Sequence, residues 1–156
     1  RALLLGGAAG AAAGLGAGEA RAVAISVGEE DGFVGTPEQQ IAAAEATLQE
    51  LVKLECWEEL VCDGDDIRRF LGTVGVKSPF FKFEKALKAV YGELDDSKLP
   101  DLEDVVGRVR QADFLAYSTN FAIASGGMDP KPYARDCLKE LNKLEKDLAA
   151  IVKVLP

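Results

Sequence analysis

Residues 129–155 read DPKPYARDCLKELNKLEKDLAAIVKVL, and this stretch decides the fold class. Its apolar side chains recur at steps of three and four residues, the spacing of one face of an α-helix. They are Ala134, Cys137, Leu141, Leu144, Leu148, Ile151 and Leu155. Asp129 and Pro130 stand before this stripe as a capping residue and a first-turn proline. The pattern predicts a long amphipathic helix with one side buried against other helices.

The same signals predict three more helices upstream. A first helix of about 26 residues begins at Thr36-Pro37 and ends at Cys62-Asp63-Gly64. Its apolar stripe is Ile41, Ala44, Leu48, Leu51, Leu54, Trp57 and Val61. A second spans roughly residues 79–95, after Ser78-Pro79, and a third runs from Pro100-Asp101 to Ser125-Gly126-Gly127. Short links between the last three predict an all-α, up-down-up-down four-helix bundle over residues 36–156.

Residues 1–35 are predicted to lie outside this bundle. Arg1 is followed by an uncharged run, residues 2–18, and then by Ala22-Val23-Ala24, which is the layout of an export leader. Glycines fall four apart in the run, a spacing that lets helices approach in lipid, although an Ala/Gly-rich leader reaches it by composition alone. We expect a leader-like hydrophobic arm that contacts a partner or the membrane through residues 2–18, followed by a flexible link over residues 25–35.

Composition excludes several classes of function. A net charge of -8 would repel nucleic acid, so a docking partner is expected to be basic or to meet a local cationic patch on this chain. The chain has no histidine, the commonest general base and metal ligand, and we therefore expect no enzyme, no metal site and no cofactor. Asp63, Asp65 and Asp66 fail the calcium-loop pattern, because Arg68 and Val74 occupy its Gly and Glu positions.

The three cysteines are too few for a zinc site. In an up-down-up-down bundle the end of the first helix meets the start of the last. Cys56 and Cys137 then lie at one level, each about 10 Å from that shared end. The geometry predicts a Cys56–Cys137 disulfide with Cys62 free, and three buried, reduced thiols are the alternative.

Residues 64–79 read GDDIRRFLGTVGVKSP and contain more Gly, Asp, Arg and Pro residues than a turn needs. Asp65 is expected to cap a short helix that turns Ile67, Phe70 and Leu71 inward, with Gly72 and Gly75 at sharp bends. Arg68 and Arg69 are adjacent and point to different sides, so at least one is expected to face outward.

This stretch is predicted to form a docking tip with arginine and aromatic anchors. The candidate partner-binding residues are Asp65, Arg68, Arg69, Gly72, Thr73, Gly75 and Phe81. Phe81 is included because it lies off the predicted core stripe. A structural alternative, compatible with docking, is that Asp63, Asp65 and Asp66 pair with the arginines and lock the connection.

The run in residues 64–79, together with AYSTNF in residues 116–121, resembles the PsbQ-related extrinsic photosystem II subunits of diatoms and other red-lineage algae. The resemblance covers about residues 36–156. It implies a four-helix-bundle protein of the chloroplast thylakoid lumen, peripheral on the membrane. It further implies binding to the photosystem II core and other extrinsic subunits, and shielding of the oxygen-evolving centre without catalysis.

Two alternatives to this function remain open. One is a lumenal subunit of photosystem I or of another thylakoid complex. The other is a helical bundle that carries a pigment, haem or lipid.

Overall fold

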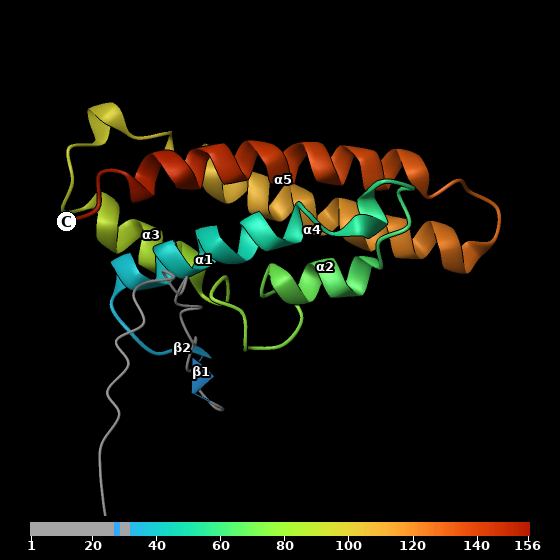
Figure 1. Cartoon of the computed structure of the whole chain (residues 1–156), viewed down its shortest axis with the longest axis horizontal. Coiled ribbons are helices and arrows are strands. Elements are labelled where there is room, and N and C mark those ends of the chain that lie inside the picture. The colour runs from blue at the N-terminus through green and yellow to red at the C-terminus, as the bar shows by residue number, and fades with distance from the viewer. Residues whose placement is uncertain (1–26, 29–31) are drawn as a thin grey trace, which may run out of the picture.

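The computed structural model describes residues 27–28 and 32–156, so the expectations for residues 1–26 lie outside the described chain. The described part is mainly helical, which confirms the all-α class (Figure 1). Its elements are β1 (Val27–Gly28), β2 (Gly32–Phe33), α1 (Pro37–Leu51), η1 (Glu55–Trp57), α2 (Gly64–Phe70), α3 (Phe83–Tyr91), η2 (Asp96–Lys98), α4 (Leu102–Ser125) and α5 (Lys131–Val152). None of these helices is both long and apolar enough to cross a membrane.

The two longest helices, α4 and α5, form the most extensive helix pair. Gly126, with φ +64°, ends α4, and a short loop returns the chain to α5 alongside it (Figure 1). α1 packs against α5, α2 packs against α4, and α3 packs mainly against α1. The second helix predicted over residues 79–95 is therefore wrong in extent, because α3 is shorter and α2 precedes it as a separate helix.

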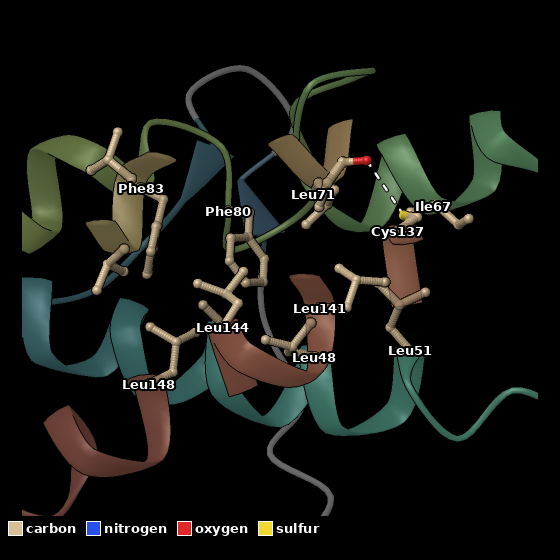
Figure 2. Close-up of a cluster of buried hydrophobic side chains, with 14 of the residues drawn as sticks. Leu48, Leu51, Ile67, Leu71, Phe80, Phe83, Cys137, Leu141, Leu144 and Leu148 are labelled. Atoms are coloured by element: carbon tan, nitrogen blue, oxygen red, sulfur yellow. Dashed lines mark hydrogen bonds between the residues drawn. The ribbon is translucent and has the colours of Figure 1, made fainter. Parts of the chain in front are cut away.

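The core lies where α5 meets α1 and the segment from α2 to α3. Leu141, Leu144 and Leu148 of α5 lie in one buried cluster with Leu48 and Leu51 of α1 (Figure 2). Ile67, Leu71, Phe80 and Phe83 lie in the same buried cluster. The stripe predicted for the last helix is confirmed from Ala134 to Ile151, since each of its members is fully buried. Burial of these side chains is the main force that holds the helices together.

The structure corrects the predicted extent of the first helix. The capping box at its start is confirmed: Thr36 Oγ1 accepts from the Gln39 amide, and Gln39 Oε1 accepts from the Thr36 amide. However, α1 ends at Leu51, whose carbonyl accepts the Trp57 indole N–H at 2.8 Å. That bond satisfies one of the carbonyls that a helix end leaves unpaired. Leu54 and Val61 are consequently exposed instead of joining the core.

The predicted Cys56–Cys137 disulfide is also wrong. Cys56 is bonded to Cys62, with Cα atoms 4.8 Å apart, and Cys137 is a free, buried thiol. The prediction assumed a continuous helix, in which Cys56 and Cys62 would lie about 9 Å apart along the axis. Because α1 ends early, the chain turns back and brings these two cysteines together. Cys137 Sγ donates to the Ala112 carbonyl at 3.4 Å (Figure 2), and burial raises the pKa of its thiol to about 12.

The segment before α3 is a set of turns, although Ser78-Pro79 predicted a helix start. The Phe81 amide donates to the Ser78 carbonyl at 2.9 Å, and Lys82 adopts a left-handed φ of +57°. Gln40 of α1 holds these turns by donating to the carbonyls of Pro79 and Phe81. A helix can begin only after the left-handed residue, at Phe83.

β1 and β2 pair antiparallel in the region predicted to be a flexible link. Val27 lies opposite Phe33, and Gly28 lies opposite Gly32. A Cβ atom at Gly32 would overlap the Phe81 ring, so this hairpin rests directly on the turns before α3. Part of the predicted link is therefore ordered by contact with the helical domain.

Candidate docking site

The short helix α2 supplies the two arginines of the predicted docking tip. Its N-cap is Asp63, not Asp65 as predicted: Asp63 Oδ1 accepts from the amides of Asp65 at 2.7 Å and Asp66 at 3.4 Å. Ile67 is buried as expected, and so is Leu71, the residue that follows the helix. Gly72 and Gly75 adopt φ values of +69° and +82°, which confirms the two bends.

Gly64 brings α2 unusually close to α4. Its amide donates to Asn120 Oδ1 at 2.7 Å, and a Cβ atom on it would overlap the carbonyl oxygen of Ala116. Gly64 begins the first run that carries the family resemblance, and Ala116 and Asn120 belong to the second. These separate parts of the chain are thus in direct contact.

Arg68 faces inward and ties α2 to α4. Its Nε lies 2.9 Å from Asp113 Oδ1, and its Nη1 lies 3.5 Å from Asp65 Oδ1. Thr73 donates to the same Asp113 carboxylate, and the guanidinium lies 5.3 Å from the centre of the Tyr117 ring. The alternative of a locked connection is confirmed for Arg68. Its main partner, Asp113, was missed because it lies on another helix.

Arg69 faces outward, with 60% of its side chain exposed. Its only ion pair within the described residues is with Asp66, one turn earlier on α2. Such exposed pairs contribute little to stability and separate easily. Of the two arginines, Arg69 is therefore the one available to a partner.

A hollow of about 290 Å³ lies beside α2 and brings Gly72, Thr73 and Phe81 together. Its wall is completed by residues of the turns, of α3 and of α4, namely Leu71, Phe80, Lys82, Phe83, Glu84, Val106, Val109 and Arg110. Asp65 and Gly75 do not line it. Phe81, which lies off the predicted core stripe, is partly covered by the hairpin and by the Lys82 ammonium, 5.2 Å from the ring centre.

Positive charge is concentrated in the stretch of the chain that contributes residues 71–73 and 80–84 to this hollow. Residues 67–91, here called the basic segment, contain six Lys or Arg and one Glu, a net charge of +5, so the rest of the chain carries -13. Lys77, Lys82 and Lys85 are exposed, and none of them pairs with a carboxylate within the described chain. The basic segment can therefore attract an acidic surface despite the net charge of the chain.

Three aromatic side chains of α4 form a second exposed feature that the sequence reasoning missed. Phe114, Tyr117 and Phe121 are between 52% and 60% exposed. With Ser118, Met128 and Tyr133 they line a hollow of about 300 Å³. The steps of three and four between them were a usable signal, because they form a second apolar stripe beside the core stripe. The apolar stripe predicted for this helix, from Leu102 to Ile123, is wrong at its last member, because Ile123 is exposed while Ala122 is buried.

No family model, curated protein or solved structure matches this chain. Within the described residues, no group of three or more Cys, Asp or Glu side chains is arranged to hold a metal ion. The residues and surfaces above are therefore the basis for a proposal about function.

The charged cap of α2 leads us to expect that stability depends on pH. Hydrogen bonding from the Asp65 amide lowers the pKa of Asp63, so the charged cap stabilises the fold above the ordinary Asp pKa and this stabilisation is lost as pH falls through the lowered value. Asp63→Asn keeps an equally good neutral cap. We expect the free energy of unfolding of the wild type to exceed that of the variant by about 0.5 kcal/mol at pH 7, given solvent screening, and this difference to shrink at pH 3. Urea unfolding at the two pH values measures this difference in free energy of unfolding. A difference that does not change with pH would contradict the charged-cap explanation.

Proposed function

We propose that this protein is a non-catalytic subunit that docks on the lumenal side of photosystem II and shields its oxygen-evolving core. The observation that carries the proposal is the basic segment. It has a net charge of +5 in a chain of -8, three of its lysines are exposed and unpaired within the described chain, and part of it lines a mainly apolar hollow. Opposite charge on the partner would speed encounter and fix orientation, and buried aromatic and arginine anchors would supply affinity.

The contact between α2 and α4 brings together the two runs whose resemblance this proposal rests on. Both runs that carry the resemblance meet at Gly64, Ala116 and Asn120, so they act as one structural unit. We further propose that α2 and α3 together take the place of the second helix of an up-down-up-down bundle over residues 36–156. This arrangement agrees with the packing of α2 on α4 and of α3 on α1.

The disulfide supports localisation of this protein outside reducing compartments. Disulfides persist mainly in oxidising environments and are rare in the cytosol. The Cys56–Cys62 bond therefore agrees with export to the thylakoid lumen, where the docking partner would be located.

Charge reversal in the basic segment is expected to weaken docking. The variant Lys77→Glu/Lys82→Glu/Lys85→Glu removes three exposed cations and should lower affinity for salt-washed photosystem II membranes at least tenfold at low ionic strength. Rebinding of purified protein, followed by sedimentation and immunodetection, measures the affinity. Recovery of chloride- or calcium-independent oxygen evolution reports on shielding.

The matched control variant changes the net charge by the same amount, at positions outside the basic segment. Lys131→Glu/Lys146→Glu/Lys153→Glu alters three exposed cations on or just after α5 and should lower affinity less than threefold. Equal losses in both variants would show that only net charge matters and would refute the basic segment as the docking site. Binding of the wild type to photosystem I instead of photosystem II would refute the proposed partner.

A further inference from the structure

We propose that the Cys56–Cys62 disulfide is a thiol–disulfide exchange site for an external dithiol, and that its reduction releases the start of α2. The bond lies in the connection between α1 and α2, outside both helices. Exchange with a reductant requires that one sulfur is accessible and that the other can leave. Release of α2 requires that breaking the bond removes a restraint on that helix. Each requirement is met by the residues of this loop.

Access differs between the two cysteines. Cys56 is partly exposed, whereas Cys62 is only 2% exposed. A thiolate must approach the disulfide in line with the S–S bond. Because Cys56 is the more exposed of the two residues, its sulfur is the expected point of attack. Exposed Leu54 and Val61 close to the two cysteines offer an apolar contact for a protein reductant.

The charge of the loop selects among reductants. Residues 55–63 read ECWEELVCD and contain four carboxylates and no cation. An anionic thiol is repelled by this loop, and a neutral or cationic thiol is not. The site therefore suits a dithiol protein whose surface around its active cysteines is neutral or basic.

Chemically, the exchange proceeds in two steps that balance. The thiolate of the dithiol attacks Cys56 Sγ, the S–S bond breaks, and Cys62 leaves as a thiolate that takes up a proton. The second thiol of the reductant, as its thiolate, attacks the reductant sulfur of the mixed disulfide. Cys56 is released and protonated. Two electrons pass to the cysteine pair, and the dithiol becomes a disulfide.

Reduction affects α2 because Cys62 directly precedes its cap. Asp63 caps the helix and Gly64 seats it against Asn120 of α4. In the closed loop Leu60 has a left-handed φ of +58°. The Val61 amide donates a hydrogen bond to the Cys56 carbonyl at 2.9 Å. When the cross-link opens, the loop gains conformations, and the first turn of α2 loses a restraint. The α4–α5 pair contains neither cysteine of the bond and keeps its packing.

The first test uses small thiols on the full-length protein under native conditions. Cysteamine, 2-mercaptoethanol and glutathione are compared at equal thiolate concentration, and adducts are located by peptide mass spectrometry. We expect the adduct on Cys56, and glutathione at least threefold slower than cysteamine at low salt, with the difference shrinking at high salt. An adduct mainly on Cys62, or reduction no faster than global unfolding, would overturn the exchange site.

The second test measures the consequence. After reduction with dithiothreitol, native alkylation should label Cys56 and Cys62 but not Cys137, whose burial protects it. Amide hydrogen exchange should accelerate at least tenfold over residues 61–67 and stay unchanged in α5. The variant Cys56→Ser/Cys62→Ser should show the same acceleration without reductant, and Cys137→Ser should not. Unchanged exchange in the double variant would refute the release of α2. Because these tests use the isolated protein, their outcome is independent of the proposed docking.

Discussion

Gly72→Ala is expected to destabilise the protein by about 2–4 kcal/mol, from two separate causes. Gly72 has φ +69°, a left-handed conformation that an alanine adopts at a cost of about 1–2 kcal/mol. A Cβ atom there would also overlap the backbone where Phe80 joins Phe81. Because that backbone is held by Gln40, it cannot move aside freely. Urea unfolding followed by circular dichroism measures the loss.

Gly75 provides a matched control for the overlap. Its φ of +82° carries the same conformational cost, but nothing lies within 4 Å of its Cβ position. Gly75→Ala should therefore lose only about 1–2 kcal/mol. Equal losses at the two positions would mean that the contact between the turn at Gly72 and the segment at Phe80 does not constrain the fold.

Gly64→Ala is expected to cost about 2–3 kcal/mol, although alanine is the better residue inside a helix. The added methyl group would overlap the Ala116 carbonyl and crowd Asn120, so α2 has to move away from α4. That movement would lengthen the Gly64–Asn120 hydrogen bond and expose Ile67. Thermal and urea unfolding of the two proteins give the difference.

Gly107 is the control for intrinsic helix preference. It lies on an exposed part of α4 with nothing within 4 Å of its Cβ position. Gly107→Ala should stabilise the protein by up to about 1 kcal/mol. A Gly64→Ala variant that gained stability in the same way would contradict the close approach of α2 to α4.

The glycine variants and the lysine variants together distinguish residues that maintain the fold from residues that bind the partner. The glycine variants should lose binding only to the extent that they unfold. The lysine variants of the basic segment should lose binding while their urea midpoints stay close to that of the wild type. A Gly72→Ala variant that lost binding while remaining folded would instead favour the predicted partner-binding role of Gly72.

Local signals in the sequence determined most helix positions. The Thr36 cap and first-turn proline of α1, the Asp101 cap of α4 and the Gly126 end of α4 act within three or four residues, so the sequence alone located them. The buried stripe of α5 was also readable, because its period matches the helix and its residues are consistently apolar. The bends at Gly72 and Gly75 were readable for the same local reason.

What the sequence could not decide depends on contacts between distant residues. The end of α1, the pairing of Cys56 with Cys62 and the choice of Asp113 for Arg68 follow from where the chain lies in space. The exposure of the aromatic stripe on α4 likewise depends on which face its neighbours cover. Hydrophobic periodicity identifies a buried face without identifying its neighbour. The sequence therefore determined the mainly helical fold class but not which surfaces meet. Only tertiary packing decided which residues are locked inside and which remain free to bind.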